Sequence, residues 1–347
     1  MGVQASFGLR LGRMKKGARN LITDVPGVRV GHVTLKNGDD VNTGVTAIIP
    51  HEGNIFRDKP LAASHVINGY GKSVGLVQVD ELGTIETPLV LTNTLSVGTA
   101  STALIRYMLE RNEDIGDTTS TVNPMVFECN DGHLNDIRGL HVTEQHVLDA
   151  LACASETCEE GDVGAGTGMS CYSMKGGIGS ASRVFELYGE TYTLGALLLT
   201  NFGSQRDLMI AGDAVGERMY RANHPDEAEK GSVIVILATD APLSARQLAR
   251  VARRAQSGLA RTGSIAGNGS GEIALAFTTR NRLPHYETGK PHTIELVYEE
   301  DIDVVFRAAI ESVEESVISS MTHAHRVVGR KSHTRECLAD ELRKIEK

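Results

Sequence analysis

The sequence predicts an α/β fold built from sandwiched sheets. Two nearly continuous apolar runs, residues 192–200 and 232–239, have the length of strands that are buried on both faces. Apolar residues recur at helical spacing over residues 97–110 and again over 303–321. Glycine-rich loops flank the central strands, and we find neither repeats nor a long linker. This pattern favours packed sheets over regular βαβ units, within a single domain spanning residues 1–347.

The other elements follow in order along the chain. A turn at Pro26 and Gly27 precedes an alternating strand that ends near residue 34. The first half also predicts a helix at 142–154 and short strands at 44–50, 74–79 and 89–92, and residues 124–128 form a short apolar segment. The second half predicts a helix capped by Ser244, a polar loop or short helix at 213–230, and strands at 272–277 and 294–298.

The composition argues against several classes of protein. A net charge of −9 disfavours nucleic acid as a partner, and the longest apolar runs are strand-sized, which argues against a membrane span. The five scattered cysteines contain no CxxC pair and the histidines no HExxH motif, so we expect no disulfide framework, metal or organic cofactor. The N-terminus lacks the apolar core of a signal peptide, which makes the cytoplasm the expected compartment.

Three glycine motifs depart from the patterns that they resemble. Residues 69–73 look like the end of a P-loop, but Val66 stands where that pattern needs a glycine, so we interpret the segment as a tight turn. Residues 164–168 differ from GxGxxG because Met169 follows them. Asn268 breaks the GxSxG pattern around Gly269-Ser-Gly.

The junction between Gly231 and Ser232 carries more specific chemistry. A charged loop ends at Gly231, and Ser232 opens an apolar strand, which as structure alone is an ordinary transition from loop to strand. A Gly-Ser peptide held in a strained turn can also undergo an N→O acyl shift and hydrolysis, since glycine permits unusual backbone angles. Cleavage would leave Ser232 with a free α-amine, whose reference pKa of about 7.7–8 suits it to accept the hydroxyl proton without a histidine.

Three polar residues at other strand ends could complete such a site. Asn201 follows the first apolar strand, and a carboxamide there can donate a hydrogen bond to an oxyanion. Ser270 and Glu272 flank Gly271 at the start of another strand and could relay or orient protons around Ser232. Taken singly, each of the three fits a structural role as well.

A series of motifs in fixed order covers about residues 20–280. The matching stretches are Ile22–His32, Asn93–Gly98, Glu128–Gly132, Leu134–Asp136, Gly164–Met169, Lys175–Gly179, Thr200–Gly203, Gly231–Ser232, Ala238–Leu243 and Arg261–Glu272. Each is weak alone, but their order is specific. In these stretches the chain resembles the DmpA-type aminopeptidases, the group of L-aminopeptidase/D-esterases and β-aminopeptidases.

The resemblance implies a four-layer αββα sandwich. Its layout is that of N-terminal-nucleophile hydrolases, with the strand connectivity that this family shares with ornithine acetyltransferases. It further implies self-cleavage into an α chain of residues 1–231 and a β chain of residues 232–347 that stay associated. Members form homo-oligomers, often tetramers, so we expect a homotetramer of such αβ units.

The resemblance also implies roles for individual residues. By motif position Ser232 is the nucleophile, Asn201 an oxyanion-hole donor, and Ser270 with Glu272 the assisting pair. Glu128 matches an acidic residue that holds the free amine of the substrate, a role that also follows from chemistry because an aminopeptidase must recognise an ammonium group.

Two further residues in the matching stretches, Asn130 and Gly271, are predicted to bind substrate. Cys129 and His133 fall in a segment that shapes the substrate pocket and that varies among relatives. The choice among α-amino amides, D-amino esters and β-peptides therefore stays open.

The leading prediction is a self-processing serine aminopeptidase acting on short peptides, amino-acid amides or esters. An acyltransferase of ornithine-acetyltransferase type is the first alternative, and Ser232 argues against it because that group uses threonine. The second is an unprocessed relative without catalysis, against which the Gly231–Ser232 junction, Asn201 and Glu272 argue.

Overall fold

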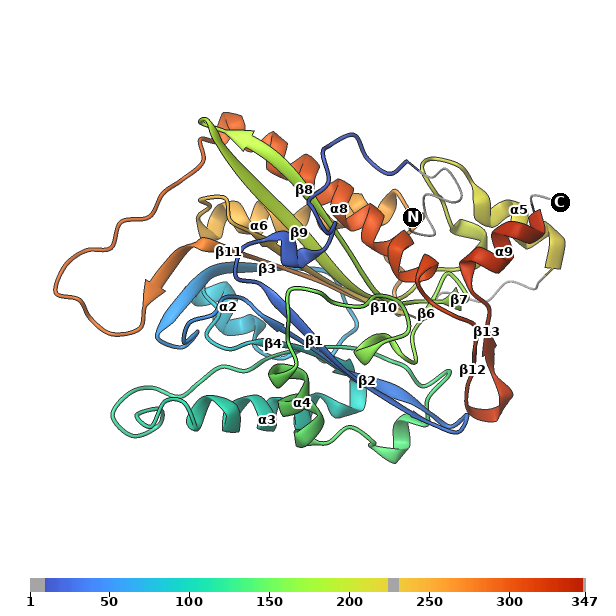
Figure 1. The fold of residues 1–347 in the computed structure, drawn as a ribbon, viewed down its shortest axis with the longest axis horizontal. Coiled ribbons are helices and arrows are strands. Elements are labelled where there is room, and N and C mark those ends of the chain that lie inside the picture. Colours follow the sequence, from blue (N-terminus) through green and yellow to red (C-terminus); the bar gives the residue numbers. More distant parts are fainter. Residues whose placement is uncertain (1–9, 224–230, 346–347) are drawn as a thin grey trace.

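The computed structural model describes residues 10–223 and 231–345 and arranges them in four layers (Figure 1). Two β-sheets lie face to face in the middle. Helices α6 (Ala245–Arg253) and α8 (Asp303–Thr322) cover the outer face of one sheet, and α3 (Val97–Leu109) and α4 (Glu144–Ala152) cover the outer face of the other. The predicted αββα sandwich is therefore the fold of the chain.

The larger sheet has five strands among the described residues, in the order β3-β11-β10-β9-β8. Strands β10 and β11 run parallel, and the other neighbouring pairs are antiparallel. The strands are β3 (Asp58–Gly69), β8 (Gly177–Leu187), β9 (Glu190–Asn201), β10 (Ser232–Thr239) and β11 (Gly271–Pro284). Both apolar runs of the sequence thus become central strands, as predicted.

The smaller sheet has four strands in the described part of the chain, in the order β1-β2-β4-β5. They are β1 (Arg29–Asn37), β2 (Val41–Ile49), β4 (Leu89–Asn93) and β5 (Met125–Cys129). Two short hairpins lie outside both sheets: β6 (Ser170–Cys171) with β7 (Met174–Lys175), and β12 (Val327–Val328) with β13 (Thr334–Arg335). The remaining helices are α2 (Leu76–Leu82), α5 (Val215–Asn223), α7 (Ala255–Ala260) and α9 (Leu338–Ile345).

Strand β10 contributes to two cores because its side chains alternate between its faces. Val233, Val235 and Leu237 pack into the core beneath α6 and α8. Residues 234, 236 and 238 pack into the core between the two sheets. By the same alternation the side chain of Ser232 points toward the layer between the sheets, at the end of the strand.

Two predicted strands are wrong. Residues 76–82 form helix α2, because Gly75 adopts a φ of +101° directly after Val74 and turns the chain out of the extended conformation. Only glycine fits there, since a Cβ atom at residue 75 would lie 2.4 Å from Sδ of Met125. Residues 294–298 are irregular and mostly exposed, and Val297 alone among them is buried.

Two other expected elements are confirmed with different limits. The hydroxyl of Ser244 accepts a hydrogen bond from the backbone N–H of Gln247 and caps α6, but the helical segment breaks at Arg254 before α7 begins. The polar segment 213–230 contains helix α5, and residues 224–230 lie outside the described residues. Each described helix is too short or too polar to cross a membrane.

Candidate active site

Ser232 is the centre of a group of residues that three neighbouring strands bring together. In the register of the larger sheet, Ser232 pairs with Asn201 on one side and with Gly271 on the other. The backbone N–H of Gly271 donates a hydrogen bond of 3.0 Å to Oγ of Ser232. These three residues are far apart in the sequence, and each was predicted as a site residue. They meet where β9 ends and where β10 and β11 begin.

Gly231 lies in a place that excludes any side chain. A Cβ atom at this position would lie 1.8 Å from the carbonyl oxygen of Asn201 and 2.6 Å from Cα of Phe202. The backbone before Ser232 is thus pressed against the end of β9, where a bulkier residue would displace the junction. The charged loop that precedes Gly231 lies outside the described residues.

The carboxamide of Asn201 is held by two hydrogen bonds. Its Oδ1 accepts from the backbone N–H of Ser170 at 2.9 Å, and its Nδ2 donates to the carbonyl oxygen of Asn130 at 3.0 Å. An amide nitrogen carries two hydrogens, so a fixed Nδ2 can present its second N–H to a ligand. Asn130 therefore acts on this site through its backbone, which the sequence did not indicate.

Glu272 is buried on the helix-facing side of the larger sheet. It pairs with Val233, next to Ser232, and its Oε1 accepts hydrogen bonds from the hydroxyls of Ser270 (3.1 Å) and Ser264 (3.2 Å). The structure thus links Glu272 to Ser232 through Ser270 and the Gly271 backbone. Ser264 was not predicted, because its distance in sequence from Glu272 matches no recognised spacing.

Glu128 is buried at the end of β5, beside the segment interpreted as a tight turn. One carboxylate oxygen accepts from the backbone N–H of Lys72 at 2.8 Å, and the other accepts from the hydroxyl of Thr94. A Cβ atom at Gly71 would lie 3.5 Å from Oε1 of Glu128 and 3.7 Å from Cα of Gly271. The turn, closed by a hydrogen bond of 2.9 Å from Gly71 to Gly69, therefore lies between Glu128 and the Ser232 site.

A cavity of about 640 Å³ opens next to Ser232 on the β9 side. Its lining includes Asn130, His133, Ser170, Asn201, Gly231 and Arg335. His133, which falls in the segment expected to shape the substrate pocket, lines this cavity. Cys129 does not line the cavity; its side chain lies in the core between the sheets, with Sγ 3.7 Å from the carbonyl oxygen of Leu199. Arg335 was not predicted.

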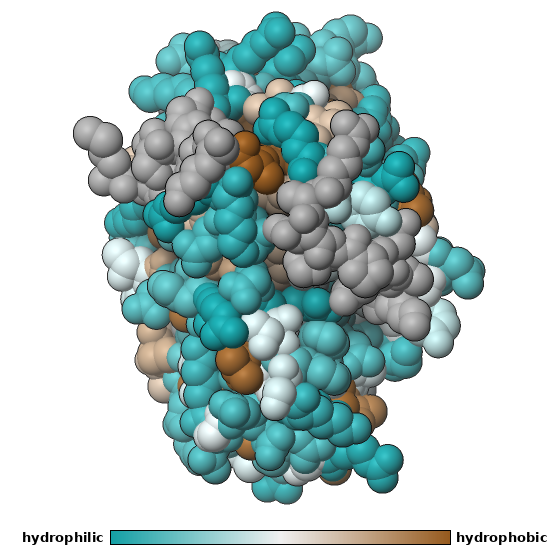
Figure 2. Space-filling model, turned by 90° about the vertical axis from the view of Figure 1, so that its right-hand side faces the viewer, coloured by the Kyte–Doolittle hydropathy of each residue, from teal (hydrophilic) through white to brown (hydrophobic). Residues whose placement is uncertain are grey.

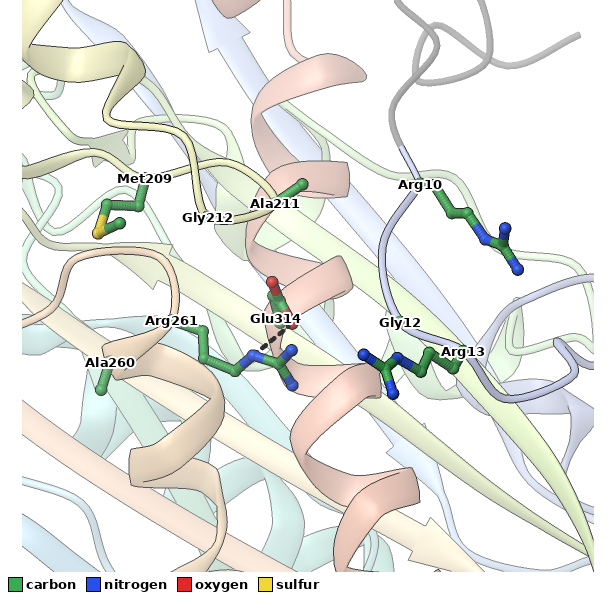
Figure 3. Close-up of a pocket in the computed structure, with 9 residues that line it drawn as sticks. All are labelled: Arg10, Gly12, Arg13, Met209, Ala211, Gly212, Ala260, Arg261 and Glu314. Carbon is green, nitrogen blue, oxygen red and sulfur yellow. Dashed lines mark ion pairs between the residues drawn. The ribbon is translucent and has the colours of Figure 1, made fainter.

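A second cavity, of about 720 Å³, lies on the outer side of α8 (Figure 3). Arg13 and Arg261 extend toward one another across it, and Arg261 forms an ion pair of 3.0 Å with Glu314. Arg10, Met209 and Gly212 also line it. The predicted site residues do not, so the first cavity is the candidate substrate site.

The described residues contain no group of three or more histidine, cysteine, aspartate or glutamate side chains placed to hold a metal ion.

Asp131 is a buried acid next to the candidate site. Its carboxylate accepts hydrogen bonds from the hydroxyl of Thr43 at 2.6 Å and from Nδ2 of Asn135 at 3.0 Å. Burial raises the pKa of Asp131 to about 7, because the charged form loses its hydration, and the two hydrogen bonds oppose this increase only in part. Asp131 therefore titrates near neutral pH in the folded protein.

This raised pKa predicts a dependence of stability on pH. Between pH 3.8 and about 7 the folded protein retains the Asp131 proton while the unfolded chain has lost it, so the free energy of unfolding falls as the pH rises. Asp131→Asn keeps the shape and stays neutral, so we expect it to be the more stable form above pH 7, by about 2–4 kcal/mol at most. Urea unfolding at several pH values measures this effect.

The matched control is Asp149→Asn, which changes an exposed carboxylate on α4. It should leave the pH profile of the wild type intact. A profile that keeps the same slope in Asp131→Asn would contradict the prediction.

The fold and the site together define the class of protein. An αββα sandwich with a serine at the start of a central strand is the layout of the N-terminal-nucleophile hydrolases. The sequence pattern of Peptidase family S58 matches residues 20–335, and the chain belongs to that family.

Comparisons with individual proteins agree with this assignment. The β-peptidyl aminopeptidase BapA of Sphingosinicella microcystinivorans is 37% identical over 355 residues, which cover 95% of this chain and 88% of that protein. The crystal structure of the PH0078 protein from Pyrococcus horikoshii OT3 is 54% identical, with a TM-score of 0.94 over 99% of this chain and 98% of that one.

A third relative is the L-aminopeptidase D-Ala-esterase/amidase from Ochrobactrum anthropi. It is 37% identical, with a TM-score of 0.91 over 98% of this chain and 97% of that one. That enzyme is described as a prototype for the serine aminopeptidases and as a new variant among the Ntn hydrolase fold. The present protein is thus a serine aminopeptidase, which confirms the aminopeptidase assignment of the leading prediction, and the acyltransferase alternative is not favoured.

Proposed function

We propose that this aminopeptidase cleaves itself between Gly231 and Ser232 and then uses Ser232 as its N-terminal nucleophile. The observation that carries the proposal is the register that sets Ser232 between Asn201 and Gly271. Ser232 is also the first residue of β10, so the cut leaves every described strand whole. The two chains stay together because β10 remains paired with β9, and β11 with β3.

In the self-cleavage step, Oγ of Ser232 attacks the carbonyl carbon of Gly231. The peptide C–N bond breaks as the ester C–O bond forms, and the nitrogen leaves as the α-amine of Ser232. Water then hydrolyses the ester, which leaves a carboxylate on Gly231 and restores the hydroxyl. The backbone N–H of Gly271, which donates to Oγ, orients the hydroxyl oxygen for this attack.

In the peptidase reaction, the same oxygen attacks the carbonyl carbon of a substrate. The α-amine of Ser232 takes the hydroxyl proton and later gives it to the leaving amine, and water hydrolyses the acyl-enzyme. Nδ2 of Asn201 donates to the oxyanion, which a fixed donor stabilises strongly in a site that excludes water. The hydroxyls of Ser270 and Ser264 donate to Glu272, and these three side chains position the backbone at Gly271 and orient protons near Ser232.

Self-cleavage is tested by measuring the mass of the purified protein. We expect two chains, of 231 and 116 residues, on a denaturing gel and in intact mass spectra. A single stable chain of 347 residues would contradict the proposal. A panel of aminoacyl p-nitroanilides, with β-alanyl and D-alanyl forms, then decides among the substrate classes that the relatives' names suggest.

Glu128 is proposed to bind the free amine of the substrate. Glu128→Gln keeps the hydrogen-bonding shape and removes the charge, so we expect kcat/KM for an L-alanyl p-nitroanilide to fall about 10–100-fold, mainly through KM. The measurement is steady-state hydrolysis by the processed variant.

The control for Glu128→Gln is a propionyl p-nitroanilide, which lacks the amine. The variant should hydrolyse it as slowly as the wild type does. An equal loss on both substrates would mean that Glu128 shapes the site and does not hold the amine.

We further propose a cytoplasmic homotetramer of αβ units. The five cysteines are odd in number and scattered along the chain, which agrees with a reducing compartment. Light scattering should give a mass about four times 37.2 kDa. A monomer would contradict this proposal without affecting the assignment of Ser232.

A further inference from the structure

A lysine that has no exposed surface lies near the candidate site. It is Lys175, on β7, whereas a lysine side chain ordinarily keeps its ammonium group in water. Strand β7 lies on the side of the molecule that Figure 2 faces, where the surface is mainly hydrophilic. A position in contact with water is therefore close by, and the reason for the buried position of Lys175 must be sought in its contacts.

The amine of Lys175 joins two separate segments of the backbone. Its Nζ donates hydrogen bonds to the carbonyl oxygens of Gly166 at 2.9 Å and of Gly176 at 2.7 Å. Burial lowers the pKa of Lys175 to about 7, because the ammonium loses its hydration, and the charge of Asp162 opposes this decrease only in part. A neutral amine still carries two hydrogens. Lys175 can therefore hold the two segments together whether or not it carries a charge.

The two carbonyl groups lie before and after the hairpin formed by β6 and β7. Ser170 pairs with Lys175 across this hairpin. The backbone N–H of Met169, directly before Ser170, also donates to the carbonyl oxygen of Gly166, at 3.2 Å. The backbone N–H of Gly176 donates to the carbonyl oxygen of Met169 at 3.1 Å. The amine thus completes a closed set of hydrogen bonds at the open end of the hairpin.

One peptide group connects this set of hydrogen bonds to the candidate oxyanion donor. Its carbonyl oxygen, from Met169, accepts from Gly176, and its N–H, from Ser170, donates to Oδ1 of Asn201 at 2.9 Å. Because a peptide group is planar, the bond at one end fixes the direction of the group at the other. The carboxamide of Asn201 is planar as well, so the bond at Oδ1 helps to set the direction of Nδ2.

The hairpin depends on its surroundings because its turn is strained. Tyr172 and Ser173, at its tip, have φ angles of +50° and +57°. Residues other than glycine rarely adopt this conformation, and it persists where the surrounding structure holds it. At the base of the hairpin, a Cβ atom at Gly176 would lie 2.7 Å from the carbonyl oxygen of Thr200. A loosened hairpin would therefore shift against the end of β9.

We propose that Lys175 is a positioning residue for the oxyanion donor: its amine holds the hairpin of β6 and β7 and, through the N–H of Ser170, fixes the direction in which Asn201 presents Nδ2. This inference rests on the proposed roles of Asn201 and Ser232. Lys175 is not among the described residues that line the cavity, so it acts without touching the substrate. A displacement of about 1 Å in a catalytic group can cost about 10²-fold in rate. Lys175 should therefore affect kcat and the rate of self-cleavage, and KM much less.

The test is a double-mutant cycle between Lys175 and Asn201. Its readout is kcat for the L-alanyl p-nitroanilide, measured after intact mass shows two chains. Lys175→Met keeps an unbranched side chain and removes both donors, and we expect it to lower kcat about 10–100-fold when Asn201 is present. When Asn201 is replaced by alanine, the same change should lower kcat less than about 3-fold, because the donor that Lys175 positions is already missing. Two losses that multiply would overturn the proposal.

The matched control is Lys59→Met, at a mostly buried lysine that pairs with Glu86. Lys59 lies near the start of β3, whereas the end of β3 pairs with Gly271 at the site. Lys59→Met should lower the urea midpoint of unfolding and leave kcat unchanged, with or without Asn201. If Lys175→Met gave the same result, with lower stability and the kcat of the wild type, Lys175 would only support the fold and the proposal would be overturned.

A second variant keeps the test decisive if Lys175→Met does not fold. Lys175→Gln leaves a polar group beside the two carbonyl oxygens, but its side chain is one atom shorter and cannot bond to both, so it should show the same dependence on Asn201. If neither variant folds, Lys175 is a residue of the fold and the proposal is overturned. For a folded variant that does not process, the rate of self-cleavage replaces kcat in the cycle.

The same cycle separates this inference from the proposed function. If Asn201→Ala itself kept the kcat of the wild type, the proposed role of Asn201 would fail, and the role of Lys175 with it. If Asn201→Ala lost kcat and the folded variants of Lys175 did not, this inference alone would fail.

Discussion

Replacing Ser232 with alanine is expected to leave one uncleaved chain without aminopeptidase activity. The substitution removes the oxygen that attacks both the Gly231 carbonyl and the substrate, and an uncleaved chain also lacks the α-amine that would accept the proton. We expect a loss in kcat of about 10⁶-fold, the scale on which a serine hydrolase depends on its nucleophile. Intact mass and p-nitroanilide hydrolysis measure the two effects separately.

A control serine comes from a helix remote from the site. Ser101 lies on α3, and its hydroxyl donates a hydrogen bond within its own helix, to the carbonyl oxygen of Val97. Ser101→Ala should process and hydrolyse like the wild type. If Ser232→Ala still yielded two chains, another group would have to carry out the cleavage. If it kept activity, the nucleophile would lie elsewhere.

Replacing Asn201 with alanine is expected to lower kcat about 10²–10³-fold with a much smaller change in KM. The reason is that Nδ2 of Asn201 meets an oxygen that becomes negative only during the reaction, so its loss affects the transition state more than the bound substrate. Self-cleavage passes through a similar oxyanion and should slow as well. Steady-state kinetics and a time course of processing give both rates.

The variant Asn201→Asp separates this role from a structural one. Aspartate keeps the acceptor for the Ser170 N–H but offers no donor to an oxyanion, so it should lose as much kcat as alanine does. A loss of stability without a loss of kcat in either variant would show that the carboxamide only ties the end of β9 to the strand end at Asn130.

Local sequence pattern predicts many of the strands and helices of this fold. Strand β10 matches its apolar run, and α8 matches its helical spacing, because a continuous or periodic apolar pattern has few ways to be buried. Strand β3 has no such pattern: its second half carries His65 and Asn68 and is only partly buried. Its place at the edge of the larger sheet came from pairing with β11, which local pattern does not encode.

The wrong strand at residues 74–79 has a tertiary cause. Residues 74–79 have the composition of a strand, yet only Val74 pairs, in a single bridge with Val126, before Gly75 turns the chain. The close approach of Met125 to Gly75 is a tertiary contact, so the signal for the turn was invisible in the segment itself.

The sequence by itself determined which groups can do chemistry in this protein. The Gly231–Ser232 junction, the carboxamide of Asn201 and the carboxylates of Glu128 and Glu272 were all identifiable from residue type and motif. Only the tertiary structure decided how they are arranged: the register of β9, β10 and β11 sets Asn201 and Gly271 on either side of Ser232. It also placed Arg335 in the lining of the cavity beside Ser232, through a hydrogen bond to Ser170, 165 residues earlier in the chain, which local spacing cannot reveal.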